Sequence, residues 1–480
     1  MMSTVAPIPE DGERAARSAD APGGRRRWQF RLAAVLLGML PLLAFEGLCR
    51  VCDWGRPALH DDPFVGFQSV RPLFVLSDDG MQYEVPKFRQ VYFCAESFPA
   101  RKPANAYRIF CLGGSTVQGR PFAIETSFTS WLEISLRAAQ PEINWDVVNC
   151  GGVSYASYRL LPIMQEVLAC EPDLIILCTG HNEFLESRTF EHLAARGEVV
   201  NRAIAVASRL RTFTLIREQY LRARGQSSDA PREGRPLLPT EVDALLDYRN
   251  GLEDYRRDET WRNGVIGQFQ YNLAALVRTA QEAGVPILVV NPVSNLRDCP
   301  PFKSLHRDDL TAQEQAEWEA LCSEADRHLD REHLDRPAAI DCLEQACRID
   351  PQYAATFYRL GHCYLEAHRN DEALQMFERA RDLDICPLRI LPPMNAAIFE
   401  VARDTGTPLF DAQALFESHS RDGIVGDQWL LDHVHPSIDG HQLLADALAD
   451  KLVEMRTVSP APDWPEVRQA RYQENLESLP

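Results

Sequence analysis

The sequence predicts an α/β fold: a three-layer sandwich with a five-stranded parallel sheet, interrupted by an all-helical insertion and preceded by one N-terminal transmembrane helix. Three observations support this prediction. Short apolar runs alternate with amphipathic stretches, which is typical of parallel strands connected by helices. The segment between the fourth and fifth runs has the spacing of a helical repeat. A long apolar run begins at Leu32.

The composition excludes some classes of function. The formal net charge of the 480-residue chain is −19. Contacts with phosphates need clustered Lys and Arg, so we expect no nucleic-acid partner. The 13 cysteines show no repeated spacing and several lie in apolar runs, which favours small buried side chains over a disulfide framework.

The N-terminal region divides into two parts. Residues 1–27 are polar, and we expect a disordered cytoplasmic tail there. Residues 28–54 contain the apolar run from Leu32 to Phe45, which we interpret as a signal-anchor transmembrane helix. Arginines precede this run, so the positive-inside rule places the N-terminus in the cytoplasm and the catalytic domain outside it. A cleaved signal peptide and a soluble amphipathic segment are the alternatives.

The rest of the chain alternates between strands and helices, so we expect the sheet to be covered on both faces. After a strand that ends near Leu112, strands are predicted at residues 145–149, 173–178, 287–292 and 407–411. The predicted segments are a lead-in region (55–103), the first part of the α/β domain (104–300, with a helical insertion at about 188–265), a repeat-like insertion (308–387), the second part of the α/β domain (388–455) and a C-terminal tail (456–480).

The insertion at residues 308–387 resembles tetratricopeptide repeats. Small and large apolar residues recur at the spacing of this 34-residue repeat, namely Phe357, Leu360, Gly361, Tyr364, Ala373, Phe377 and Ala380. Such arrays usually need about three repeats to be stable alone, so we expect this shorter one to lean on the α/β domain. It either binds a protein partner or only shapes the wall of the active site.

The first strand ends in Gly113-Gly114-Ser115. Glycines let the backbone turn sharply, and ligands of open α/β sheets bind beyond the carboxyl ends of strands. Ser115 is therefore a candidate nucleophile, and the alternative is a helix N-cap. Polar residues also follow the next two strands, in the turn at 149–154 and at Asn182.

Asp432 and His435 are three residues apart, a spacing that puts both side chains on one side of a tight turn. A serine nucleophile needs a base within hydrogen-bond reach, and the base needs an orienting carboxylate. Asp432 and His435 supply both from a single loop. The alternative is a zinc site formed with His433. Otherwise we expect neither a metal nor a cofactor.

The order of these motifs resembles the SGNH (GDSL-like) hydrolases. The resemblance implies that Ser115 is the nucleophile, His435 the general base and Asp432 the residue that orients it. It also implies an oxyanion site formed by the Ser115 N–H, the Asn182 side-chain amide and an N–H of the second block. Gly152 and Ser154 are both candidates for this last donor.

Three positions depart from the pattern of this family. Gly114 stands where many members have Asp, and Glu183 replaces the usual Asp after Asn182. An ungapped match of the second block places Ser154 where the family has its oxyanion glycine. The second oxyanion donor is therefore the least certain part of the site.

These features together predict a membrane-anchored extracytoplasmic serine hydrolase that cleaves or transfers an O-acyl ester through an acyl-enzyme. The substrate is a small-molecule or glycan acyl ester, and the glycan is suggested by family analogy alone. One alternative is a catalytically silent scaffold whose repeat-like segment binds a protein partner. Another is a lipase that acts on the bilayer to which it is tethered.

Overall fold

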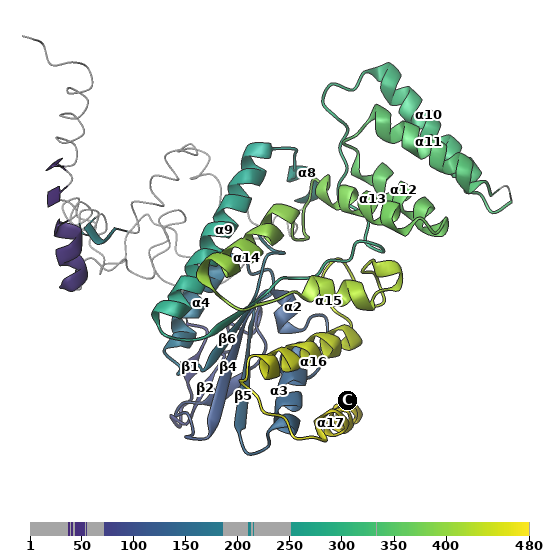
Figure 1. Cartoon of the computed structure of the whole chain (residues 1–480). Coiled ribbons are helices and arrows are strands. Elements are labelled where there is room, and N and C mark those ends of the chain that lie inside the picture. The colour runs from purple at the N-terminus through teal and green to yellow at the C-terminus, as the bar shows by residue number, and fades with distance from the viewer. Residues whose placement is uncertain are drawn as a thin grey trace, which may run out of the picture. The chain divides into compact units, whose positions relative to one another are not determined.

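The computed structural model of the chain describes residues 72–185, 251–332 and 334–479, together with single residues and short pieces within 37–54 and 210–215 (Figure 1). The chain forms two compact units. One comprises Met1–Ala58 and Ala203–Glu233, and the other Leu59–Arg202 and Gly234–Pro480.

In the first unit, the backbone N–H groups of Arg211 and Thr212 donate to the Glu46 carboxylate at 3.1 and 2.9 Å. None of the helices in the described parts of the chain is long and apolar enough to cross a membrane. The whole of the predicted tail at 1–27 and about half of the predicted anchor at residues 28–54 lie outside the described residues.

The second unit contains the predicted five-stranded sheet, whose order is β5-β4-β6-β7-β8 with every pair parallel. In the register of this sheet, Gly113 at the end of β4 pairs with Gly151 of β5 and Cys178 of β6. The carboxyl ends of the three strands therefore meet at one edge. The strands are β4 (Ala106–Gly113), β5 (Asn144–Gly151), β6 (Leu174–Cys178), β7 (Ile287–Val290) and β8 (Leu409–Phe410).

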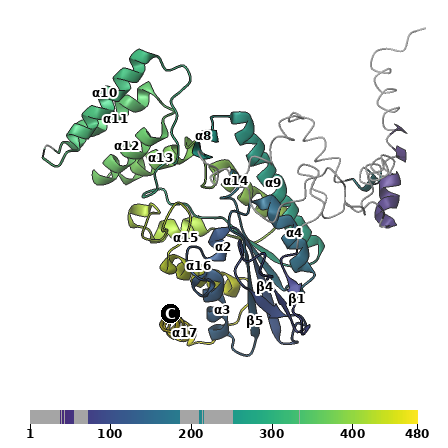
Figure 2. The same cartoon turned by 180° about the vertical axis from the view of Figure 1, so that it is seen from behind.

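Helices cover both faces of this sheet, as expected for a parallel sheet (Figures 1 and 2). Along β4, Phe110 and Leu112 pack on the side of α4, α9 and α14, whereas Ile109 and Cys111 pack on the side of α3, α16 and α17. The six helices are α3 (Phe128–Ala139), α4 (Ser157–Leu168), α9 (Glu259–Glu282), α14 (Pro392–Thr405), α16 (Ile438–Glu454) and α17 (Trp464–Ser478). Shorter helices are α2 (Ser115–Gln118), α8 (Gly251–Asp254) and α15 (Ala412–His419).

The lead-in region forms a separate antiparallel sheet of β1 (Val75–Leu76), β2 (Gln82–Glu84) and β3 (Ser97–Pro99). It is fastened to the α/β core, because the Phe98 ring packs edge-on against Phe110 with 5.4 Å between centroids. The Glu166 carboxylate of α4 also accepts hydrogen bonds from the backbone N–H groups of Leu73 and Phe74.

The repeat-like insertion consists of two helical hairpins, α10 (Ala312–His328) with α11 (Arg336–Ile349) and α12 (Ala354–Glu366) with α13 (Asn370–Asp382). Gly361 permits the close approach of α12 and α13, since a Cβ there would lie 2.8 Å from the Phe377 ring. As expected, the insertion leans on the α/β domain: Leu296 and Ile424 belong to its apolar core.

The segment that we predicted to be a C-terminal tail contains helix α17. Only Trp464 and Tyr472 of this helix are buried, so its sequence lacks the repeated apolar stripe that marks an amphipathic helix. The contacts are specific nevertheless. The Trp464 indole N–H donates to the Ser135 carbonyl at 2.9 Å, and the Tyr472 hydroxyl donates to the Trp131 carbonyl at 3.1 Å.

Replacing Trp464 with Ala should lower the free energy of unfolding by about 3–5 kcal/mol, because it leaves a cavity against α3. Chemical denaturation of the two proteins measures this. The matched control is Arg471→Ala on the exposed face of α17, which should change stability by less than about 0.5 kcal/mol. Equal effects of the two substitutions would show that α17 does not contribute to the core.

Candidate active site

Ser115 lies at the junction of β4 and α2, where there is no room for side chains on the preceding two residues. A Cβ at Gly113 would lie 2.1 Å from the Cys178 carbonyl oxygen, and one at Gly114 would lie 2.5 Å from Nδ2 of Asn182. In this structure, a side chain at residue 114 would require the Asn182 amide to move.

The structure brings the three predicted catalytic side chains together. The Nε2 atom of His435 lies 2.7 Å from Oγ of Ser115, and Nδ1 lies 2.6 Å from Oδ2 of Asp432. The carboxylate can only accept, so Nδ1 carries the proton and Nε2 is free to accept from the serine hydroxyl. This is the arrangement that activates a serine.

Asp432 is held by more than its histidine. Its other oxygen, Oδ1, accepts hydrogen bonds from the backbone N–H groups of Val434 and His435 at 2.9 and 2.8 Å. Partial burial alone would raise the pKa of Asp432, but the hydrogen bonds from the imidazole and from these two N–H groups outweigh it and hold the pKa well below its usual value. Asp432 is therefore ionised at neutral pH.

The loop that carries Asp432 and His435 is fixed at both ends. The Leu431 N–H donates to the His435 carbonyl at 2.8 Å, and Ser437 caps the N-terminus of α16 by accepting from the Gly440 N–H. From the loop after β7, the Asn295 N–H donates to the His433 carbonyl at 2.9 Å.

Asn182 lies beside the nucleophile, as predicted. Its Nδ2 donates one hydrogen bond to the Tyr155 carbonyl at 3.1 Å, which leaves a second amide hydrogen available. Together with Ser115, it lines a small cavity of about 10 Å³ whose other walls include Tyr155, His181 and Pro292.

The structure distinguishes the two candidates for the second oxyanion donor. The Gly152 N–H is already donated to the Gly113 carbonyl at 3.0 Å, as a continuation of the sheet. Within the described residues, the Ser154 N–H makes no hydrogen bond. Ser154 also has a φ of 61°, in the left-handed region that favours glycine, so it occupies the conformation expected of the family's oxyanion glycine.

The turn that carries Ser154 is supported by the lead-in region, in which the sequence indicated no chemistry. The Val153 N–H donates to the Tyr92 carbonyl at 2.9 Å. The buried Arg89 donates to the Tyr155 hydroxyl at 3.0 Å, and the Phe93 ring packs edge-on against Tyr155. No local motif marks these residues, because each acts through a contact far away in the sequence.

His181 also lines this cavity. No sequence pattern indicated that role. Its Nδ1 accepts a hydrogen bond from the Ile390 N–H at 3.2 Å, so the proton of the neutral ring resides on Nε2. Burial lowers the pKa of His181 to about 3, so the ring stays neutral at physiological pH.

Glu183 has a structural role. Its carboxylate accepts from both the N–H and the hydroxyl of Ser157 at 2.8 Å, and Ser157 is the first residue of α4. The neighbouring Asn272 amide donates to the same hydroxyl. Glu183 therefore fixes the N-terminus of α4 beneath the site, and in the described part of the chain its hydrogen bonds go to Ser157 and not to Ser115, His435 or Asp432.

The structure disfavours the zinc alternative at His433. Both ring nitrogens of His435 point at Ser115 and Asp432, so neither faces a shared ion with His433. Burial lowers the pKa of His433 to about 4, and its ring packs edge-on against Phe302.

Comparison with known proteins supplies two findings. Residues 335–384 match the family model of the tetratricopeptide repeat, which confirms the predicted repeat. A search of curated proteins finds no match.

The structural neighbours of the chain are acetylxylan esterases and acylhydrolases of the SGNH/GDSL type. An acetylxylan esterase from Geobacillus stearothermophilus is 13% identical, with 72% of this chain and 94% of that chain covered and a TM-score of 0.32. A lipase/acylhydrolase from Enterococcus faecalis is 10% identical, with 74% and 98% covered and a TM-score of 0.32.

The stability of the folded chain should depend on the protonation of Glu183. Burial raises its pKa from 4.5 to about 7, although the hydrogen bonds from Ser157 oppose this. Between these two pKa values, the folded state keeps a proton that the unfolded chain releases. The contribution of Glu183 to the free energy of unfolding is therefore complete below about pH 4.5 and falls by roughly 3 kcal/mol as the pH rises to about 7. Glu183→Gln should remove this part of the slope, as measured by denaturant unfolding across that pH range.

Glu96 contributes a similar slope, because burial raises its pKa to about 7 as well. The substitution at Glu183 should therefore reduce the pH dependence without abolishing it. An unchanged slope in the variant would contradict the assignment of a neutral, buried Glu183.

Proposed function

We propose that this protein is a serine hydrolase of the SGNH type that cleaves or transfers an O-acyl ester through an acyl-enzyme. The observation that supports this is the continuous hydrogen-bonded chain from Ser115 through His435 to Asp432. A scaffold without catalysis has no physical need for this chain of contacts.

In the proposed mechanism, Oγ of Ser115 attacks the ester carbonyl carbon while His435 Nε2 takes its proton. The carbonyl oxygen becomes an oxyanion that accepts from the N–H groups of Ser115 and Ser154 and from the free amide hydrogen of Asn182. Each such donor typically contributes about 3 kcal/mol in the transition state. His435 then protonates the leaving alcohol, and water or a second hydroxyl takes the acyl group from Ser115.

We further propose a short acyl group, with acetyl as the best fit. The cavity beside Ser115 has a volume of about 10 Å³, which is close to the space that one water molecule or methyl group needs. A longer chain would have to displace Tyr155, His181 or Pro292. A carbohydrate hydroxyl is one candidate for the alcohol part of the ester.

We propose that this enzyme acts on the extracytoplasmic side of a membrane. The support is the apolar run from Leu32 to Phe45 and the arginines that precede it. The tetratricopeptide segment is the part of the chain that we propose for binding a protein partner.

A fluorophosphonate probe should label Ser115 of the full-length protein in detergent, because the probe reacts only with an activated serine. Mass spectrometry of the peptides locates the adduct. His435→Ala should abolish labelling, and Asp432→Asn should slow it by roughly 10³–10⁴-fold because the wrong tautomer is then favoured. Absence of an adduct on the folded protein would refute the nucleophile assignment.

Nitrophenyl esters of increasing acyl length test the size of the acyl group. We expect kcat/KM to fall at least about 100-fold from acetate to octanoate, since each added methylene has no room beside Ser115. Ser115→Ala supplies the background rate. Rising activity with chain length would contradict the short-acyl proposal and favour the lipase alternative.

A further inference from the structure

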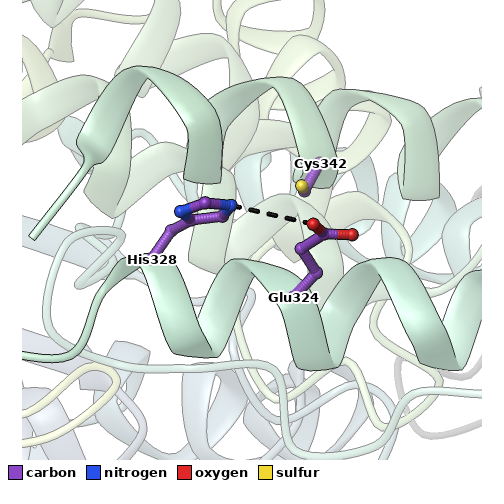
Figure 3. A group of neighbouring side chains, drawn as sticks. All are labelled: Glu324, His328 and Cys342. Carbon is purple, nitrogen blue, oxygen red and sulfur yellow. Dashed lines mark ion pairs between the residues drawn. The ribbon is translucent and has the colours of Figure 1, made fainter. Parts of the chain in front are cut away.

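Three potential metal ligands converge on the first hairpin of the tetratricopeptide segment. Glu324 and His328 belong to α10, and Cys342 belongs to α11. One carboxylate oxygen, one ring nitrogen and the sulfur atom all lie within 4.8 Å of one another (Figure 3). We propose that these side chains bind a Zn²⁺ ion that links α10 to α11.

Helix geometry puts the first two ligands side by side. Residues four apart lie on the same face of a helix, and Nε2 of His328 is 3.9 Å from Oε1 of Glu324. This distance is too long for a hydrogen bond. It is close to the roughly 3.3–3.8 Å that separates two ligands of a tetrahedral zinc ion at ordinary bond lengths.

The donor set selects the ion. Zn²⁺ accepts sulfur, imidazole nitrogen and carboxylate oxygen together, whereas Mg²⁺ and Ca²⁺ require oxygen ligands. Cys342 is buried between the helices, while the side chains of Glu324 and His328 are 48% and 32% exposed. The ion can thus enter from solvent and keep a water molecule as its fourth ligand.

A metal link to α11 would stabilise the packing of helix α10. Its two buried residues, Cys322 and Ala325, are both small, and its larger apolar side chains Trp318 and Leu321 are only partly buried, so much of this 17-residue helix is exposed. A zinc ion shared with α11 would join the two helices of the hairpin.

Titration of the metal-free full-length protein with Co²⁺ tests the proposal. We expect one ion per chain, a thiolate-to-cobalt charge-transfer band in the near ultraviolet and visible bands typical of a four-coordinate ion. Cys342→Ser should abolish the charge-transfer band, and His328→Gln should weaken binding at least about tenfold. The control is Cys347→Ser, which removes another thiol of α11 and should leave the spectrum unchanged.

Thermal unfolding with Zn²⁺ supplies a second readout. The melting temperature should rise with Zn²⁺ concentration in the unsubstituted protein and in Cys347→Ser, and much less in His328→Gln, whose partly exposed side chain is not needed for folding. Two results would overturn the proposal: no cobalt band in the folded unsubstituted protein, or equal affinity in the His328 variant.

Discussion

The hydrogen bond between Ser115 and His435 joins residues 320 positions apart, and it forms only if two separate turns are both rigid. The first turn is fixed by close packing, because Gly113 and Gly114 lie against the end of β6 and the Asn182 amide. The second is fixed by hydrogen bonds, since Asp432 accepts from two backbone N–H groups of its own loop. The geometry of this serine, histidine and aspartate set therefore depends on backbone contacts more than on the flexible side chains that they position.

The lead-in region and the tetratricopeptide insertion support two loops at the site, the turn at Ser154 and the loop at residues 432–435. The lead-in region supports the Ser154 turn through Tyr92 and Arg89. The tetratricopeptide insertion contacts the loop after β7, where the Tyr358 hydroxyl donates to the Arg297 carbonyl at 2.9 Å. The same loop bonds to His433 through Asn295, so the insertion is connected by packed residues to the catalytic loop.

Burial sets the protonation states of two histidines and one glutamate around the site. It keeps His181 and His433 neutral by lowering their pKa values, and it raises the pKa of Glu183. Asp432 differs, because hydrogen bonds hold its pKa well below the usual value. In the proposed mechanism, the imidazolium that forms on His435 would face this one fixed carboxylate, which is the electrostatic arrangement that a serine nucleophile needs.

Local pattern was enough to predict the parallel sheet, the tetratricopeptide repeat and the Ser115, Asp432 and His435 set, because strand ends and a four-residue motif are visible in the sequence. Arg389 shows the limit of such patterns. Arg389 belongs to no motif in the sequence, yet its side chain is buried and donates to the Asn295 and Cys299 carbonyls. Only the tertiary structure showed that the Gly152 N–H is already donated to Gly113 and revealed α17, because each depends on hydrogen bonds to segments far away in the chain.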